Sequence, residues 1–318
     1  MKVLIVRFSS IGDIVLTTPV VRCVKMQLTG VELHFLTRKK FAGVIDQNPY
    51  IDKLITMDDK LSEVIPALKK EQYDCVIDLH HNLRTFKLKK ALGKTAYSFN
   101  KLNLEKFLIV HFKIDRLPQK HIVERYLEAV EPLGVKNDHK GLDYFIAEKD
   151  QITITEKLPV AFHKGYYALV VGGSYYTKQI PLNKLLEICK LSPKPLVLLG
   201  GKEDSFIAQQ VTAAYKDKTI NLCGDLNLNQ SASVIQQSLK VITSDTGLMH
   251  IAAAYKKDII SVWGNTIPEF GMGPYLAGDQ SQILEVKNLP CRPCSKLGYR
   301  KCPKGHFKCM NDIVIADL

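Results

Sequence analysis

The chain has 318 residues, of which 46% are hydrophobic and 24% are charged, and its formal net charge is +12. This composition is typical of a soluble globular protein with room for two domains. No apolar run approaches the ~20 residues of a membrane span, and the first apolar run stops at Arg7, too early for a signal peptide. We therefore expect a cytoplasmic protein. The positive net charge indicates either anionic partners or only a basic surface that faces solvent. It is also compatible with peripheral contact with the inner membrane.

In the first half of the chain, β-rich runs alternate with helical patterns. Strands are predicted at residues 2–8, 31–37, 51–55 and 73–79, and helices at 14–27, 61–70, near 84–90 and within 117–133. This alternation predicts βαβ units and a parallel sheet. The sequence then turns polar and irregular between residues 135 and 166. We place the domain boundary in this stretch and expect domains at 1–158 and 159–318.

The same alternation resumes in the second half. Strands are predicted at residues 167–171, 196–199, 240–243 and 259–263, and helices at 181–191, after 201, at 229–239 and from about 246. The predicted fold class is therefore α/β, with two similar lobes in tandem. Ligands of parallel sheets bind beyond the carboxyl ends of the strands, so we expect the site between the lobes.

The stretch from Ser244 to Ala254 is the most informative part of the sequence. It follows an apolar strand and opens a helix, with Asp245 and Thr246 suited to capping and Gly247 permitting close approach of the backbone. The N-terminus of a helix is a natural seat for an anion such as a phosphate. His250 comes one turn after the cap, on the same face of the helix. The alternative is a simple helix cap followed by a structural histidine.

Two further strand ends carry glycine. Gly172, Gly173 and Ser174 are followed by Thr177 and Lys178, so that backbone N–H groups and an ammonium can approach a phosphate together. After the next strand, a Gly-Gly pair precedes two acids, and a carboxylate there can accept hydrogen bonds from ribose hydroxyls. Those acids are Glu203 and Asp204. The alternative for each is a polar helix start, and neither loop matches the Walker A or dinucleotide motif.

The first half offers one candidate acid and one basic surface. Asp13 lies where the first strand passes into the first helix, and it is either a site carboxylate or an acid stabilised by the helix dipole. A helix that carries Arg84, Lys87, Lys89 and Lys90, with Lys94 beyond it, would suit an anionic acceptor or form a solvated helix face. Nucleic acid is disfavoured as a partner, because no recognised binding fold is evident.

The eight cysteines fall into two groups. Cys23, Cys75, Cys189 and Cys223 stand alone in apolar surroundings and are predicted to be buried. The other four form a C-x2-C-x7-C-x6-C pattern, with His306 inside it, in a basic tail. These are Cys291, Cys294, Cys302 and Cys309. The spacing is compatible with a structural zinc site, and the alternative is free thiols.

Three segments together resemble glycosyltransferase family 9, the bacterial lipopolysaccharide heptosyltransferases. They are VLIVRFSSIGD at residues 3–13, DCVIDL at 74–79 and SDTGLMH at 244–250. The resemblance covers almost the whole chain. It implies a GT-B-type fold of two Rossmann-like lobes facing a central cleft, an anionic glycolipid acceptor (the lipid A-linked core of lipopolysaccharide) at the first lobe and a nucleotide sugar, ADP-heptose above all, at the second. It also implies inversion at the anomeric carbon without a required cofactor or metal.

The resemblance assigns roles to individual residues. It makes Asp13 the general base and Lys178 the contact to the donor phosphates. It places Glu203 near the ribose-contacting acid, with Asp204 as the alternative. The remaining matches, to the pyrophosphate and donor-sugar motif, are Asp245, Thr246, Gly247 and His250. The chain departs from the family at Ile180, where tryptophan is common.

Three other functions are compatible with parts of the sequence. A nucleotide-sugar epimerase uses the same two-lobed scaffold but needs no acceptor. A non-catalytic nucleotide-sugar sensor, or a scaffold on anionic lipid, needs no base. An RNA partner is suggested only by the net charge.

Overall fold

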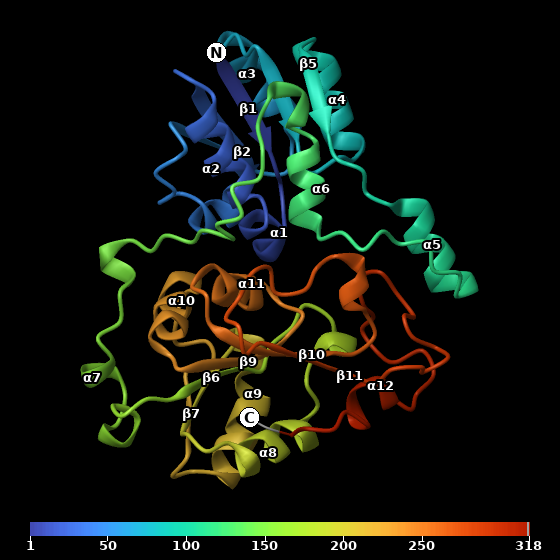
Figure 1. Ribbon diagram of the computed structural model, residues 1–318. Coiled ribbons are helices and arrows are strands. Elements are labelled where there is room, and N and C mark those ends of the chain that lie inside the picture. The colour runs from blue at the N-terminus through green and yellow to red at the C-terminus, as the bar shows by residue number, and fades with distance from the viewer. Residues whose placement is uncertain (317) are drawn as a thin grey trace. The chain divides into compact units, whose positions relative to one another are not determined.

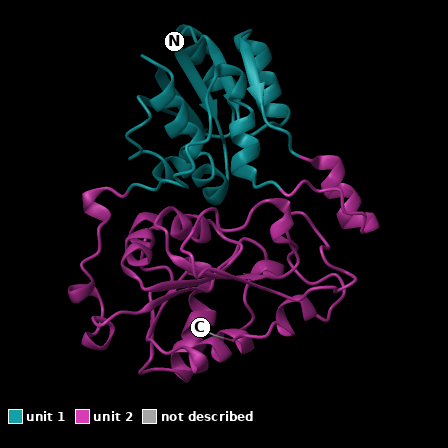
Figure 2. Ribbon diagram, viewed as in Figure 1, with its two compact units in different colours: residues 1–101, 120–145 teal, residues 102–119, 146–318 magenta. Residues whose placement is uncertain are grey.

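The computed structural model describes residues 1–316 and 318, and the chain forms two compact units. Unit 1 comprises residues 1–101 and 120–145, and unit 2 comprises residues 102–119 and 146–318 (Figure 2). The sequence placed the boundary at residue 158, whereas the units divide between Phe145 and Ile146. The segment 102–119 is assigned to unit 2 although unit 1 flanks it in the chain.

Unit 1 contains a five-stranded sheet in the order β3-β2-β1-β4-β5, and all of its strand pairs are parallel (Figure 1). Strand β1 lies at the centre because Val3, Leu4, Ile5 and Val6 are all fully buried, as a strand covered on both faces requires. The strands are β1 Lys2–Val6, β2 Glu32–Arg38, β3 Lys53–Met57, β4 Cys75–Asp78 and β5 Thr95–Ser98. The helices are α1 Ile11–Val15, α2 Thr18–Gln27, α3 Ile65–Lys70, α4 Leu83–Leu92 and α6 Ile122–Glu128.

The single helix predicted over residues 14–27 is wrong, because this stretch forms two helices. Helix α1 ends at Val15, and α2 begins at Thr18 with Pro19 in its first turn. Proline has no N–H to donate and its ring disfavours a preceding helical turn, so it is tolerated at the start of a helix and breaks one in the interior. The break makes α1 a short element directly after β1, and Asp13 lies within it.

Unit 2 contains a six-stranded sheet in the order β11-β10-β9-β6-β7-β8, with parallel strand pairs throughout. The strand order reverses between β6 and β9, and ligands of such sheets bind at the carboxyl end of that switch point. The strands are β6 Tyr167–Val170, β7 Leu196–Leu199, β8 Thr219–Asn221, β9 Lys240–Ser244, β10 Asp258–Trp263 and β11 Gln282–Glu285. The helices are α5 Asn103–Phe112, α7 Ile154–Lys157, α8 Leu182–Leu191, α9 Ser205–Ala214, α10 Leu228–Gln237, α11 Gly247–Ala254 and α12 Lys308–Asn311.

Helix α5 packs on unit 2 through one apolar side. Ile109 is buried against Ile267 and Phe270, and Val110 and Leu117 pack around them. Lys106 lies over the Phe270 ring at 5.7 Å. Within the described residues, neither α5 nor any other helix is long and apolar enough to cross a membrane.

Candidate active site

Asp13 of unit 1 is held by an arginine and a serine. Its Oδ1 lies 2.8 Å from Arg7 Nη2, and its Oδ2 accepts hydrogen bonds from Ser10 Oγ at 2.8 Å and Ser10 N at 3.1 Å. The Asp13 side chain is still 25% exposed. It therefore combines a fixed orientation with access to solvent at the carboxyl edge of β1.

Arg7 is the buried residue that fixes this arrangement, and the sequence did not single it out. Its Nη1 donates to Tyr126 Oη at 2.9 Å, and its Nε donates to the Ser9 carbonyl at 2.7 Å. Its guanidinium thus ties α6 and the β1–α1 loop to the carboxylate of Asp13. The sequence signal for Arg7 is its position, because a charged residue at the end of an otherwise apolar strand needs a buried partner.

His80, which follows β4, belongs to the same neighbourhood. The centre of its ring lies 5.0 Å from that of Phe8, and it interacts electrostatically with Arg7 and Asp13. Burial, followed by the positive charges of Arg7 and Lys101, lowers the pKa of His80 to about 4. It is therefore a neutral imidazole at pH 7.

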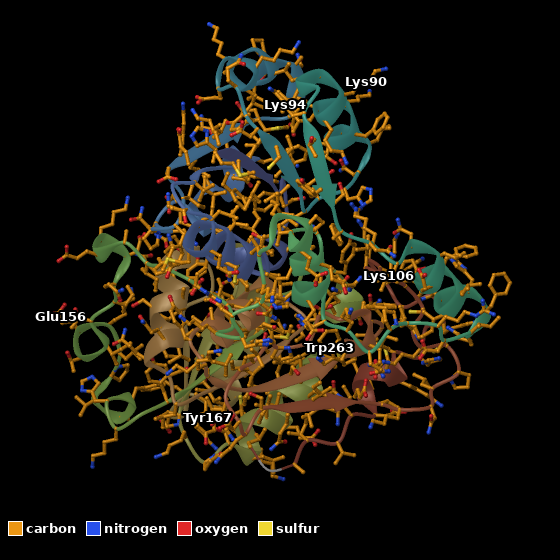
Figure 3. All side chains as sticks on the ribbon, turned by 45° about the horizontal axis from the view of Figure 1, so that its top comes forward. Lys90, Lys94, Lys106, Glu156, Tyr167 and Trp263 are labelled. Atoms are coloured by element: carbon orange, nitrogen blue, oxygen red, sulfur yellow. The ribbon has the colours of Figure 1, made fainter. Side chains whose placement is uncertain are left out.

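The basic surface predicted on the first half lies on α4 and directly after it. Arg84, Lys87, Lys90 and Lys94 are exposed, and Figure 3 labels Lys90 and Lys94. Lys89 differs from them, because its Nζ lies 2.9 Å from Oδ2 of the buried Asp78. The four exposed bases thus remain available to an anion.

In unit 2, the predicted lysine and aspartate meet at the carboxyl edge of the sheet. Lys178 Nζ forms an ion pair with Oδ2 of Asp245, which also accepts a hydrogen bond from Thr266 Oγ1 at 3.2 Å. Thr246 is the N-cap of α11, and its hydroxyl accepts from Met249 N at 3.3 Å. Thr246, and not Asp245, is therefore the cap. An ammonium and the start of an eight-residue helix, which begins at Gly247, lie together at one strand end.

The glycines of the two neighbouring loops make room for a buried acid. A Cβ on Gly172 would lie 2.2 Å from Asp204 Oδ2, and one on Gly200 would lie 2.9 Å from the same oxygen. Asp204 is 6% exposed and accepts from Gly201 N at 2.8 Å. Burial raises the pKa of Asp204. Asp204 therefore has a structural position, which leaves the exposed Glu203 as the acid accessible to a ribose.

The loop after β6, which contains Gly173 and Ser174, is anchored at both ends. Gln179 Nε2 donates to the Gly173 carbonyl at 3.0 Å, and Thr177 Oγ1 accepts from Tyr299 N at 2.8 Å. Ser174, between these anchors, is exposed. His250 of α11 is 2% exposed and thus lies inside the unit.

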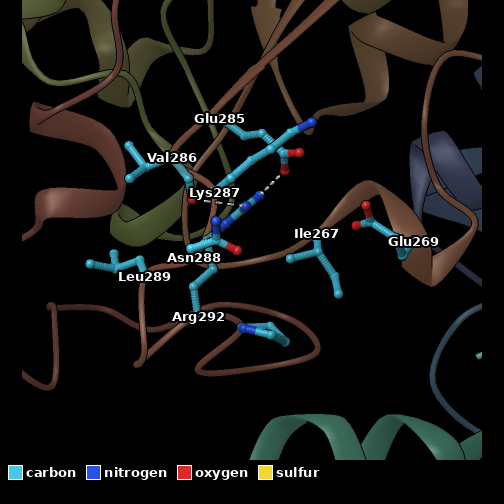
Figure 4. Close-up of a pocket in the computed structure, with 9 residues that line it drawn as sticks. Ile267, Glu269, Glu285, Val286, Lys287, Asn288, Leu289 and Arg292 are labelled. Carbon is cyan, nitrogen blue, oxygen red and sulfur yellow. Dashed lines mark hydrogen bonds and ion pairs between the residues drawn. The ribbon is translucent and has the colours of Figure 1, made fainter. Parts of the chain in front are cut away.

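A pocket of about 370 Å³ opens beside this edge of unit 2 (Figure 4). Arg292 crosses its wall, donating from Nε to the Gly264 carbonyl at 2.6 Å and from Nη2 to the Thr266 carbonyl at 2.9 Å. Its Nη2 also pairs with Glu285 Oε2 at 2.6 Å. Arg292 thereby fixes the loop after β10, which carries the Thr266 hydroxyl to Asp245.

Comparison with known proteins identifies the family. Residues 62–302 match the model of glycosyltransferase family 9 (heptosyltransferase). The chain belongs to glycosyltransferase family 9. It is 26% identical over 289 residues to lipopolysaccharide heptosyltransferase 1 of Campylobacter coli, with 84% of each chain covered.

Two solved structures are similar to this glycosyltransferase. A family 9 glycosyl transferase from Veillonella parvula has a TM-score of 0.73 and 25% identity, covering 90% of this chain and 86% of its own. The E. coli heptosyltransferase WaaC with ADP-2-deoxy-2-fluoro heptose has a TM-score of 0.66 at 21% identity, covering 89% and 92%. Together with the two parallel sheets, these structures confirm the predicted GT-B-type fold of two Rossmann-like lobes.

The ion pair in unit 1 controls the protonation of Asp13 in this glycosyltransferase. Burial by itself raises the pKa of Asp13, but the charge of Arg7 and the hydrogen bonds from Ser10 bring it down to about 2. Because the folded-state value lies below the ordinary value of 3.8, Asp13 stabilises the fold above about pH 4. That contribution is lost as the pH falls towards 2.

Replacing Arg7 by methionine is expected to flatten this acid transition. Only the Ser10 hydrogen bonds then oppose burial, so the pKa of Asp13 rises towards its ordinary value of 3.8 and the stability that wild type loses between about pH 4 and pH 2 is largely absent from the variant. The measurement is the midpoint of urea unfolding as a function of pH. Arg84→Met, at an exposed arginine, is the matched control. An identical pH dependence in Arg7→Met and wild type would contradict the role given to this pair.

Arg292→Lys tests whether the guanidinium fork holds the β10 loop. Lysine keeps the charge but cannot reach two carbonyls and a carboxylate at once, so we expect a loss of about 2 kcal/mol in the free energy of unfolding. Arg300→Lys, at an exposed arginine of the same tail, should change stability by less than about 0.5 kcal/mol. Equal unfolding curves for the two variants would show that the fork is dispensable.

The predicted structural zinc site is not supported. Cys291 Sγ lies 3.8 Å from His306 Nε2. Among the described residues, however, the cysteines belong to no group of three ligand atoms that lie within 4.8 Å of one another. The group that meets this criterion is the trio Glu32, His34 and Glu71. Burial raises the pKa of Cys294 and raises that of Cys309 to about 12. All four cysteines of the tail are free thiols in this structure.

Proposed function

We propose that this glycosyltransferase transfers heptose from ADP-heptose to a lipopolysaccharide core acceptor linked to lipid A, with inversion at the anomeric carbon. The observation that carries the proposal is the Lys178–Asp245 ion pair beside the start of α11, which brings an ammonium and the free N–H groups of a helix start to the switch point of unit 2. The names of the relatives support the sugar and the acceptor class. One is a lipopolysaccharide heptosyltransferase, and another was solved with a fluorinated ADP-heptose.

In the proposed reaction, the acceptor hydroxyl attacks the anomeric carbon while the bond from that carbon to the diphosphate oxygen breaks. Asp13 receives the hydroxyl proton. Its low pKa makes it a weak base towards an ordinary hydroxyl, so the proton moves late, when the new bond has already made the attacking oxygen acidic. Fixation by Arg7 and Ser10 orients the carboxylate for this step.

The charge that develops on the departing ADP is met by Lys178 and by the backbone N–H groups of Thr246 and Gly247. Glu203 contacts the ribose, whereas the buried His250 is not given a contact with the donor. Gly172, Gly173, Ser174 and Thr177 shape the loop over the phosphates. We assign these tasks to the chain's own groups, with no cofactor.

The exposed bases on and directly after α4 are the proposed contact for the phosphates of the acceptor. A lipid-linked acceptor brings the enzyme to the inner face of the cytoplasmic membrane, where we propose that it acts as a peripheral protein. Nucleic acid is not part of this proposal.

A transfer assay tests the function. The protein is incubated with ADP-heptose and with lipopolysaccharide from a strain that lacks core heptose. The molecular mass of the glycolipid is then measured by mass spectrometry. We expect one heptose to be added and ADP to be released. Parallel reactions with UDP-, GDP- and CMP-sugars define the donor. Conversion of ADP-heptose without acceptor would instead identify an epimerase, and binding without any conversion would identify a sensor.

A further inference from the structure

Helix α5 and the cysteine-containing tail form one surface of unit 2 that combines exposed apolar side chains with an excess of positive charge. On α5 and directly after it, Leu104 is 66% exposed, Phe107 51%, Phe112 61% and Ile114 46%. The Phe107 and Phe112 rings lie 5.8 Å apart, edge to face. Single exposed apolar residues are ordinary, but neighbouring ones in mutual contact form a patch that indicates an interaction site.

The tail extends this patch. A cavity of about 270 Å³ is lined by Phe107 and His111 of α5 together with Lys296 and Tyr299 of the tail. Lys113, directly after the helix, donates from Nζ to the Pro293 carbonyl at 2.6 Å. Helix and tail are therefore neighbours, and Leu297, which is 54% exposed, adds to the apolar area. We call this combination the α5–tail surface.

The charge of the α5–tail surface is predominantly positive. Around α5, Glu105 and Asp115 stand beside Lys106, Lys113 and Arg116. Residues 287–308 contain no aspartate or glutamate. Their basic residues are Lys287, Arg292, Lys296, Arg300, Lys301, Lys304 and Lys308. Arg292 is used internally, but Lys296, Arg300, Lys301 and Lys304 are exposed. Helix α5 itself contributes Lys106, which Figure 3 labels.

We propose that the α5–tail surface docks on an anionic phospholipid bilayer. Aromatic and aliphatic side chains that project from a short helix enter the boundary between headgroups and acyl chains, while lysine and arginine beside them attract the negative headgroups. A second copy of this chain would meet the same positive charge in an isologous contact, which the like charges oppose. Charge complementarity therefore favours the bilayer as the occupant.

The inference deepens the proposed function, in which a lipid-linked acceptor requires work at a membrane. It names the part of the protein that makes the contact. Because α5 is packed on unit 2 through Ile109, the docking surface belongs to the unit that carries the Lys178–Asp245 pair.

Vesicle binding tests the proposal without donor or acceptor, so its result is independent of the transfer assay. Full-length protein is centrifuged with sucrose-loaded vesicles of phosphatidylglycerol and phosphatidylethanolamine, or of phosphatidylcholine alone. We expect binding to the anionic vesicles that weakens with salt, and at least about tenfold weaker binding to phosphatidylcholine.

Two double variants separate the contributions of the surface. Phe107→Ser/Phe112→Ser removes the apolar anchors, and Lys296→Glu/Arg300→Glu reverses the charge. Each should lower the partition coefficient for anionic vesicles by about tenfold or more. The matched controls are Phe206→Ser, at a phenylalanine that is 72% exposed on α9, and Lys149→Glu/Lys216→Glu at exposed lysines elsewhere. Both controls should bind as wild type does.

Several outcomes would overturn the proposal. They are equal binding of wild type to neutral and anionic vesicles, wild-type binding by either double variant, and an equal loss in the controls. Thermal unfolding of every variant at the wild-type midpoint shows that a loss of binding does not come from misfolding. Sedimentation velocity without vesicles supplies a further outcome, because self-association that disappears in Phe107→Ser/Phe112→Ser would assign the surface to a second copy of the chain.

Discussion

Replacing Asp13 by asparagine is expected to reduce kcat for heptose transfer by about 10³-fold, within the range typical for the loss of a general base. Asparagine keeps the shape of the side chain and can still accept from Ser10, but it cannot take the acceptor proton. The donor seat assigned to Lys178 and α11 belongs to unit 2, so the affinity for ADP should stay within about twofold of wild type. Single-turnover kinetics and calorimetric titration with ADP measure the two quantities.

Ser10→Ala is the matched control for this substitution. It removes the 2.8 Å hydrogen bond from the serine hydroxyl to Asp13 but leaves the carboxylate and its arginine partner in place. A hydrogen bond to a carboxylate contributes about 1.5–3 kcal/mol, but Ser10 N still donates to the same oxygen, so kcat should fall by about tenfold and stay far above that of Asp13→Asn. If Asp13→Asn turned over at the rate of Ser10→Ala, the base would have to be another group, and the neutral His80 would be the first to test.

The central strands and the helix cap of the site could be predicted from sequence because local chemistry determines them. Residues 196–199 form β7 as predicted, since an unbroken apolar run is what a strand covered on both faces requires. Thr246 caps α11, as its side chain and position indicated. Signals of this kind depend on a few neighbouring residues, and the surrounding fold does not override them.

Three edge strands were missed for the opposite reason. Strands β5 at Thr95–Ser98, β8 at Thr219–Asn221 and β11 at Gln282–Glu285 are short and lie at or beside the ends of their sheets. Two residues of β5 are exposed, and most of β8 and β11 is only partly buried. An edge strand is defined by its pairing with a neighbour, and the sequence of the strand alone carries little sign of it.

The partners of the site residues could not be predicted either. The sequence assigned Asp245 to a phosphate motif and Lys178 to another, but their ion pair joins residues that are 67 positions apart. The ties of Arg7 to Tyr126 and of α5 to unit 2 are likewise contacts between distant segments. Such contacts follow from the topology, which a pattern of neighbouring residues does not contain.

Lys178→Met should lower kcat/KM for ADP-heptose by about 10³-fold, because an ammonium beside the leaving diphosphate acts mainly as its charge develops. Methionine fills a similar volume but leaves the Asp245 carboxylate without its cation, and that charge then repels the phosphates. Lys184→Met is the matched control, since it also removes a lysine from an ion pair, with Glu187 on α8. Its kcat/KM should stay within about twofold of wild type.

The double variant Lys178→Met/Asp245→Asn separates the two causes of this loss. Removing the carboxylate relieves the repulsion, so the affinity for ADP should recover by about tenfold relative to Lys178→Met, while kcat stays low because the ammonium is still missing. Titration with ADP and single-turnover rates on wild type, Lys178→Met, Asp245→Asn and the double variant measure the cycle. Full recovery of kcat in the double variant would mean that Lys178 serves only to neutralise Asp245, and the charge on the departing ADP would then have to be met by the start of α11 alone.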